Sequence, residues 1–270
     1  MWNVLLLAAA SMLVHVGSHE RLIASEARIA ERPLDASLRV EHAAALREDG
    51  QLARALDELE TARRLDPCVA SLEHECGASL LALGRDAEAE AAFTRAIESA
   101  PHDAFAHRRR ADARSRQGDF AAALEDREAV ARQIPEPEIV LELAEARRSV
   151  HGSAGALAAL DAGIARLGLV PALVLRAIEL EEERGNADAA LSRLEAWGKT
   201  LARKEQAFVL RGEILERARR FDDAHRAFES ALRAIDALGP RPQSTSATLD
   251  LRERARTAST RAAQSARRQP

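Results

Sequence analysis

The sequence has no tyrosine, and aromatic residues make up only 3% of its 270 residues. Its only lysines are Lys199 and Lys204, so arginine is the basic residue almost everywhere. Basic and acidic side chains number 39 and 43, and the resulting net charge of −4 favours neither a dedicated nucleic-acid binder nor a polyanionic tail. The apolar residues are mostly alanine and leucine, a composition that favours helices.

Cysteine is scarce as well, with only Cys68 and Cys76. If Cys76 lies about two helical turns after Cys68, their Cα atoms are about 12 Å apart, whereas a disulfide needs less than about 7 Å. We therefore expect no bridge, with Cys76 buried as a small apolar residue and Cys68 in a turn. A metal site that adds His74 is disfavoured, because two ligands two residues apart on a helix point to different faces.

Motifs that carry chemistry are absent too. The sequence has no nucleophile elbow, phosphate loop, zinc signature or spaced acidic cluster for calcium. We therefore predict no catalytic residue, no cofactor and no metal. A cryptic enzymatic site near Cys76 and His74 is the weakest of the alternatives.

Proline and glycine, in contrast, are regularly spaced. Prolines recur every 34 residues, at Pro33, Pro67, Pro101 and Pro135. A second series lies 17 residues after the prolines and continues at spacings of 34 and 33: Gly50, Gly84, Gly118, Gly152 and Gly185. Glycine closes a helix and proline prevents its continuation, so each period should hold two helices, as over residues 36–48 and 52–65 of the first. A fixed period of this length indicates a stacked helical repeat.

The residues between these breaks resemble the tetratricopeptide repeat family, whose second helix carries the pattern Ala-x-x-x-[Phe/Leu]-x-x-Ala. The best matches are Gly77, Ala89, Phe93, Ala96 and Pro101, and then Gly212, Ala224, Phe228 and Ala231. The resemblance implies an all-α fold, a right-handed α-solenoid of about six helix-turn-helix repeats over residues 36–236. The repeats are expected to start near Ala36, Ala70, Ala104, Pro137, Pro171 and Glu205.

Several residues depart from the family pattern. The fourth repeat has one residue fewer after Gly152, and aromatic positions of the first helices hold Arg39, Leu46, His107 and Arg114. Arg127 replaces a large apolar residue. Because a desolvated arginine is costly unless it is paired, we expect the third repeat to be polar-cored or locally loose.

Capping helices are expected at both ends of the repeats. Residues 19–35 should form an amphipathic helix that buries one face, made of Leu22, Ile23, Ala27 and Ala30. Residues 237–270 should form a turn and a basic helix, which contains six arginines and only two acidic residues. This last helix could touch anionic lipid, nucleic acid or the repeats' own acidic residues.

Residues 1–18 read as an export signal peptide. The apolar run over residues 4–14 is shorter than the roughly 20 residues of a spanning helix. Val16 and Ser18 supply the small-residue pattern for cleavage before His19, although the usual basic start is missing. We predict a periplasmic or secreted protein without a stable membrane span after cleavage, or a cytoplasmic one if this interpretation is wrong.

The family resemblance implies that partners bind in a groove lined by the first helix of each pair. In the third repeat the groove residues are Phe105, Arg108, Asp112 and Arg116. Asp112 can pair with either arginine at a spacing of four residues, so these side chains either form a ladder among themselves or leave an arginine for an acidic peptide. The later first helices are acidic, which suits a basic partner or an ordinary solvated face: Glu142, Glu145, Glu179, Glu182, Glu183, Glu213 and Glu216.

The function predicted from these features is a non-catalytic scaffold or adaptor that binds a peptide or helix of another protein. The carboxylate-clamp subset of the family, which reads chaperone C-terminal tails, needs lysine and asparagine where this chain has Val40, Ala44, His74 and Ala78, so that partner class is excluded. A helical-repeat nucleic-acid-binding protein is the main alternative, though nucleic acid is disfavoured because the basic last helix lacks aromatics for base stacking.

Overall fold

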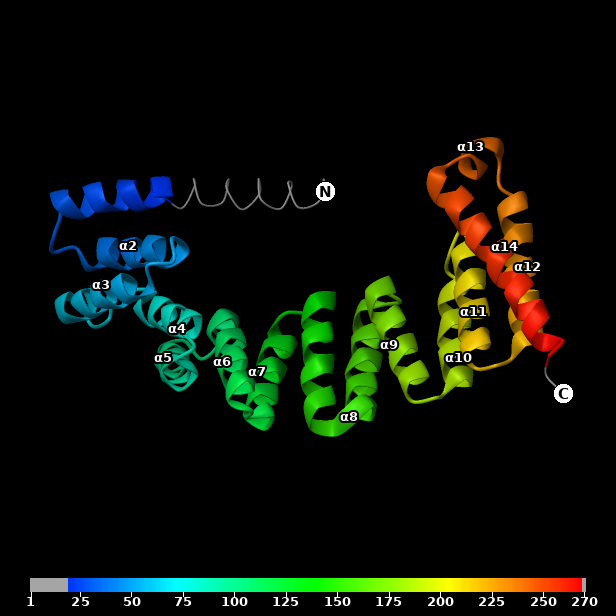
Figure 1. Cartoon of the computed structure of the whole chain (residues 1–270). Coiled ribbons are helices and arrows are strands. Elements are labelled where there is room, and N and C mark those ends of the chain that lie inside the picture. The colour runs from blue at the N-terminus through cyan, green and yellow to red at the C-terminus, as the bar shows by residue number, and fades with distance from the viewer. Residues whose placement is uncertain (1–18, 269–270) are drawn as a thin grey trace. The chain divides into compact units, whose positions relative to one another are not determined.

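A computed structural model describes residues 19–268, and every regular element in that range is a helix (Figure 1). The chain divides into two compact units, unit 1 up to Ile134 and unit 2 from Pro135 onward. Within each unit, the longer helices pack against their neighbours in the sequence. The all-α prediction is confirmed.

Unit 1 contains three helix pairs that follow a helix over residues 19–31. The pairs are α2 (Ala36–Glu48) with α3 (Leu52–Leu65), α4 (Leu72–Ala82) with α5 (Asp86–Ser99), and α6 (Ala104–Gln117) with α7 (Phe120–Gln133). Within this unit, α3 also packs on α4, and α5 packs on α6. The second repeat starts two residues later than predicted, because Ser71 just before α4 adopts a left-handed φ of 63°.

Unit 2 contains the remaining repeats, which begin at the predicted residues Pro137, Pro171 and Glu205. Its elements are α8 (Pro137–Leu167), α9 (Pro171–Glu183), α10 (Ala187–Gly198), α11 (Glu205–Arg217), α12 (Phe221–Asp236), α13 (Pro240–Gln243) and α14 (Ser246–Ala266). Helix α8 spans the whole fourth repeat, and its two halves, before and after Gly152, are the two helices of that repeat. Residues 36–236 therefore comprise six helix pairs.

The shortened fourth repeat has a turn of its own kind. Gly152 interrupts α8 with φ 67° and ψ −169°, and the helix resumes directly after it. The one-residue deletion predicted from the sequence therefore shortens the turn between the two helices of this repeat. In the last repeat, Arg219 lies 34 residues after Gly185 and therefore occupies the position that glycine has in the earlier repeats. It adopts the same left-handed conformation, with φ 58°, which costs an L-residue roughly 1 kcal/mol.

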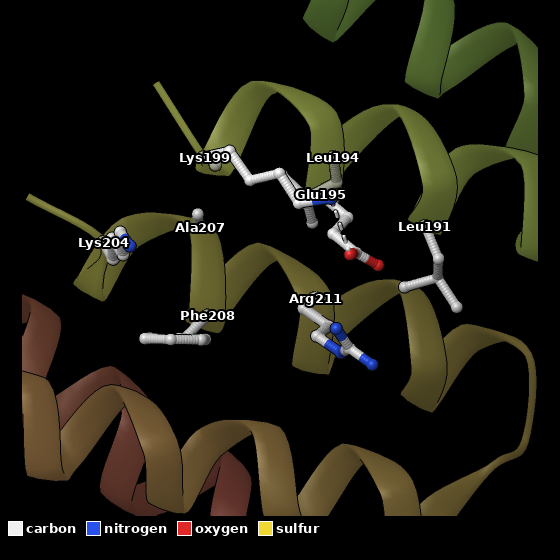
Figure 2. Close-up of a pocket in the computed structure, with 9 residues that line it drawn as sticks. Leu191, Leu194, Glu195, Lys199, Lys204, Ala207, Phe208 and Arg211 are labelled. Carbon is white, nitrogen blue, oxygen red and sulfur yellow. Dashed lines mark ion pairs between the residues drawn. The ribbon is translucent and has the colours of Figure 1, made fainter. Parts of the chain in front are cut away.

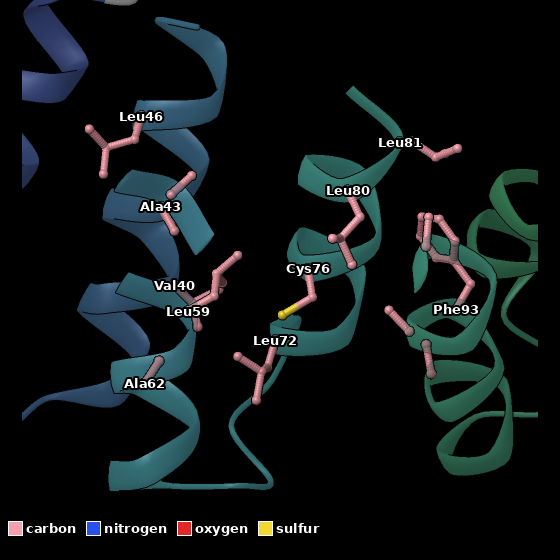
Figure 3. Packing of buried hydrophobic residues seen from close by; sticks show 14 of the residues in the cluster. Val40, Ala43, Leu46, Leu59, Ala62, Leu72, Cys76, Leu80, Leu81 and Phe93 are labelled. Carbon is pink, nitrogen blue, oxygen red and sulfur yellow. The ribbon is translucent and has the colours of Figure 1, made fainter. Parts of the chain in front are cut away.

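Glycine and phenylalanine together set the spacing of the two helices in a pair. Phe93 of α5 is fully buried, and a β-carbon added at Gly77 of α4 would lie 2.6 Å from its Cζ atom. The same pairing recurs between Phe228 and Gly212, at 2.5 Å from Cε1. Figure 3 shows Phe93 in the unit 1 core, where residues of α2, α3 and α4 including Cys76 pack together. The glycine, alanine and phenylalanine residues of the family pattern are thus buried in these two repeats, whereas Pro101 is exposed.

The helix over residues 19–31 packs on α2, but on a different face from the predicted one. Leu22 is buried as expected, whereas Ile23 is 56% exposed and Ala27 and Ala30 are exposed. Ser25 is buried in their place, where its Oγ lies 2.9 Å from His42 Nδ1 in α2. The predicted face was wrong because a buried polar residue that finds a hydrogen-bond partner can occupy a packing position.

Helix α14 packs on α12 and on α11. Two of its arginines pair with acidic residues of α11: Arg254 with Glu213 at 2.5 Å, and Arg261 with Glu216 at 2.6 and 2.7 Å. We call these the α14–α11 ion pairs. The sequence left anionic lipid, nucleic acid and the repeats' own acidic residues as possible contacts of this basic helix. In the structure, the helix contacts the repeats' own acidic residues.

The predicted signal peptide, residues 1–18, lies outside the described residues. Among residues 19–268, no helix is both long enough and apolar enough to cross a membrane.

Candidate functional site

Phe105 is an exposed aromatic residue at the start of α6, with 47% of its surface accessible. Two neighbours hold its ring. The His74 ring of α4 lies 5.5 Å away between centroids, and the Arg109 guanidinium carbon lies 5.3 Å from the ring centre. Arg109 reaches the ring because residues four apart share a helix face. We call these three residues the Phe105 patch.

Asp103 links His74 of this patch to the first turn of α6. It caps α6, since its Oδ1 accepts a hydrogen bond from the Ala106 N–H at 3.0 Å, and its Oδ2 lies 2.6 Å from His74 Nε2. Burial raises the pKa of Asp103, but the hydrogen bonds from Ala106 and His74 outweigh burial, so that the pKa is lowered overall. The carboxylate therefore stays charged and holds both the helix start and the histidine in place.

Two of the other predicted groove residues of α6, Asp112 and Arg116, have partners beyond their own helix. Asp112 accepts a hydrogen bond from Arg127 of α7 at 2.5 Å and lies 3.6 Å from Arg109. Arg116 donates to the Leu81 carbonyl of α4 at 2.9 Å and lies 3.6 Å from Asp86. Arg108 is exposed on the same helix. For Arg116 the structure thus shows a link between neighbouring helices rather than a ladder along α6.

Asp126 makes the third repeat polar-cored, as predicted. Its side chain is 2% exposed and accepts hydrogen bonds from His107 at 2.7 Å, from Arg110 at 2.7 and 2.9 Å, and from Arg114 at 2.9 Å. Burial raises the pKa of Asp126, but the hydrogen bonds from Arg110 and His107 more than offset burial, so the pKa is lowered. The buried polar residue of this repeat is thus Asp126 and not the predicted Arg127, whose side chain is 16% exposed.

Cys76 and His74 do not form a joint site. Cys76 is buried and borders a hollow of about 440 Å³, where Arg63 Nη2 lies 3.3 Å from its sulfur. Burial raises the pKa of the Cys76 thiol, which disfavours the thiolate that a nucleophile needs. His74 lies against Asp103 and Phe105. Both cysteines are free, with Cys68 exposed.

The acidic residues of α8 and α9 are paired within unit 2. Glu145 accepts from Arg176 at 2.7 and 3.0 Å, and Glu179 accepts from the same arginine at 3.0 Å. Glu183 lies 3.0 Å from Arg148. Glu142 is half-buried.

The acidic residues near α11 are paired as well. Glu182 of α9 binds Arg217 of α11 at 2.8 and 2.9 Å. Glu213 and Glu216 are held by the α14–α11 ion pairs. The acidic face is therefore largely neutralised by the chain's own arginines, which makes it a weaker attractor of basic partners than its sequence suggests.

Comparison with solved structures adds to this picture. A tetratricopeptide repeat protein from Parabacteroides merdae is 14% identical, with 94% of this chain and 98% of that chain covered and a TM-score of 0.52. The C-terminal part of a repeat-containing protein from Cytophaga hutchinsonii is also 14% identical, with coverages of 90% and 98% and a TM-score of 0.63. No protein-family model matches the sequence, and no curated protein matches it.

The chain has the tetratricopeptide repeat fold. A third similar structure, Naa15/Naa10 bound to HypK-THB, is 18% identical with a TM-score of 0.53, and the similarity covers 92% of this chain but 39% of that one. The predicted solenoid class is thereby confirmed. At these identities the likeness shows the fold alone.

Three features were missed from the sequence: the bracing of Phe105 by His74 and Arg109, the buried Asp126, and the surroundings of the two lysines. A signal for Asp126 existed. Arg39 pairs with Glu58 at 2.6 Å in the first repeat, and His107 pairs with Asp126 in the third, both at a separation of 19 residues. Arg39 and His107 occupy the same first-helix position, where the family pattern has an aromatic residue. A basic residue at that position and an acidic residue 19 positions later therefore predict an ion pair between the two helices of the repeat.

Proposed function

We propose that this chain is a non-catalytic scaffold that binds a peptide or helix of another protein on the first helices of its repeats. The Phe105 patch is the observation that carries the proposal. Phe105 is an aromatic ring left about half exposed, and it contacts the His74 ring and the Arg109 guanidinium. Covering the exposed half of such a ring would contribute about 1 kcal/mol to binding. Aromatic and arginine side chains are the ones that most often dominate the energy of protein interfaces.

The patch favours a partner segment with an apolar side chain next to an acceptor group. The ring offers a contact for the apolar group, while the Arg109 guanidinium beside it can donate to a carboxylate or carbonyl. Because Asp103 and His74 fix the neighbouring backbone and ring, little ordering entropy is lost on binding at this place.

The proposal includes a location in the bacterial envelope or outside the cell. It is supported by the apolar run over residues 4–14 and the small residues Val16 and Ser18 before His19. Mass spectrometry of the protein's N-terminus tests this part. A mature chain that starts at His19 supports export, whereas an intact Met1 in a cytosolic fraction contradicts it.

Site-specific photo-crosslinking tests the binding surface. A photoreactive phenylalanine analogue is placed at Phe105, and in a second variant at Phe120, which is 46% exposed at the start of α7 in the same repeat. The two positions match in residue type, exposure and place in a helix, so a difference in crosslinking between them reports which surface the partner contacts. We expect a protein adduct at position 105 and little or none at position 120.

A binding variant gives the complementary measurement. Phe105→Ala combined with Arg109→Glu should abolish recovery of the crosslinked partner, while Phe120→Ala should retain it. Equal recovery with both variants would show that partners do not use the first-helix surface. Adducts with RNA in place of protein would support the nucleic-acid alternative.

A further inference from the structure

A hollow of about 170 Å³ lies in unit 2 between α10 and α11 (Figure 2). Its lining is mostly apolar, with Leu191 and Leu194 from α10 and Ala207 and Phe208 from α11. Cavities of about 150 Å³ lined by apolar side chains are large enough to bind benzene. This hollow therefore has room for one large apolar side chain.

The hollow exists because small residues stand where the two helices approach each other. α10 ends at Gly198 and α11 starts at Glu205 after a non-helical segment. A β-carbon added at Gly198 would lie in ordinary van der Waals contact with Ala207 Cβ, at 3.8 Å. The two helices therefore approach closely here, and neither residue carries a long side chain that could fill the hollow. The opening is thus a feature of the backbone and its two small side chains.

Three cations and one carboxylate, that of Glu195, line this hollow. Lys199 and Lys204, the chain's only lysines, both line it together with Arg211. Lys199 lies 3.2 Å from Glu195, but within residues 19–268 no carboxylate forms an ion pair with Lys204 or Arg211. Two unpaired cations therefore border an apolar floor, in a unit where the predicted acidic face is largely neutralised.

The surface continues past the hollow along α11. A second hollow of about 240 Å³ between α11 and α12 shares Phe208 and Arg211 with the first. Its other lining residues include Arg220 and Arg226, which pair with Asp223. A ligand that reached across Phe208 would be elongated, as a peptide is.

From this geometry we propose that the α10–α11 hollow binds an acidic peptide segment of a partner protein, with one large apolar side chain seated between Leu191 and Phe208. Carboxylates flanking that side chain would accept hydrogen bonds from Lys204 and Arg211. Charge complementarity selects this occupant, because the unpaired groups are cations and the floor is apolar.

This surface is separate from the one under the proposed function. The Phe105 patch belongs to unit 1, whereas the hollow lies in unit 2. It is also distinct from the acidic face of α11, since Phe208 and Glu213 are five residues apart and so point roughly 140° away from each other around the helix. Failure of one proposal would leave the other intact.

Fluorescence of Trp197, which precedes Gly198 at the hollow, tests the proposal. The chain has two tryptophans, so Trp2→Phe in the full chain makes Trp197 the sole reporter. The probe is a peptide blocked at both ends with the sequence Glu-Glu-Phe-Glu-Glu. We expect saturable binding that is lost when glycine replaces the peptide's phenylalanine and when glutamine replaces its glutamates.

Charge reversal locates the binding. Lys204→Glu with Arg211→Glu should weaken the peptide at least about tenfold, because hydrogen bonds to charged groups contribute this much. The control reverses Arg256 and Arg267 to glutamate, two exposed arginines of unit 2 that form no ion pair in residues 19–268, and changes the net charge equally. Binding to the control should stay within about twofold of the parent.

Four results would overturn the proposal. Absence of saturable binding rejects it outright. Equal loss in both charge variants would show attraction by net charge alone. Equal binding of the glycine peptide would show that the hollow is not used. Dodecanoate, an alkyl carboxylate, serves as a competitor. If it displaces the peptide at a concentration below the dissociation constant of the peptide, the hollow would be assigned to an alkyl carboxylate instead of a peptide.

Discussion

Replacing Asp126 by asparagine should destabilise the third repeat by about 3 kcal/mol, because removing one partner of a buried ion pair costs roughly 3–5 kcal/mol. Asparagine keeps the shape of aspartate but removes the charge that His107, Arg110 and Arg114 share. The lower end of the range applies, since both arginine side chains are about one-sixth exposed, at 14% and 16%. Arg114 also keeps Glu90 as a partner at 2.8 Å.

Urea unfolding followed by circular dichroism measures this loss, with hydrogen exchange to assign it. Repeat arrays can unfold in parts, so exchange rates of individual amides show whether the loss lies in α6 and α7. Asp112→Asn is the matched control in the same repeat. Its side chain is 33% exposed and pairs with Arg127, so we expect a cost of less than about 1 kcal/mol. A cost for Asp126→Asn as small as that of the control would refute the reasoning.

Acid titration provides an independent check on Asp126. Its pKa is lowered in the folded state, so its contribution to the free energy of unfolding is complete above the unfolded value of about 3.9 and is lost as the pH falls through the folded value. The parent protein should therefore lose more stability than Asp126→Asn over that range. Identical acid dependence of both proteins would contradict the lowered pKa.

Three further predictions concern other parts of the fold. Gly77→Ala should lower the free energy of unfolding by about 1–3 kcal/mol, measured in urea, because the added β-carbon meets the buried Phe93 ring. Cys68 should react rapidly with a thiol reagent and Cys76 only after unfolding, because Cys76 is buried and burial raises its thiol pKa. Reversing both arginines of the α14–α11 ion pairs to glutamate should increase hydrogen exchange in α14, because each then faces a like charge.

The positions of the helices were determined by the sequence itself. Pro137, Pro171 and Glu205 were predicted as repeat starts and begin α8, α9 and α11. The reason is local: glycine and proline restrict the backbone at their own positions, and the 34-residue period repeats that restriction along the chain. The missing residue near Gly152 was visible for the same reason.

The choice of partners among charged side chains was decided only by the tertiary structure. Arg261 and Glu216 are 45 residues apart in the sequence, and Arg217 and Glu182 are 35 apart, so no periodicity of a single helix relates them. Ion pairing depends on which faces of neighbouring helices meet, and packing of the whole repeat sets those faces. From the sequence alone, these glutamates suited either a basic partner or an ordinary solvated face, and only the folded structure shows that arginines of the chain pair with them.

The lysines illustrate the same limit. Lys199 and Lys204 stood out in the sequence as the only two of their kind, but nothing in their spacing indicated a hollow. The hollow depends on Gly198 and Ala207 from successive helices lying opposite each other, which a one-dimensional pattern does not encode. Local backbone chemistry determined where the helices begin and end, and the packing between helices determined which side chains were left for a ligand.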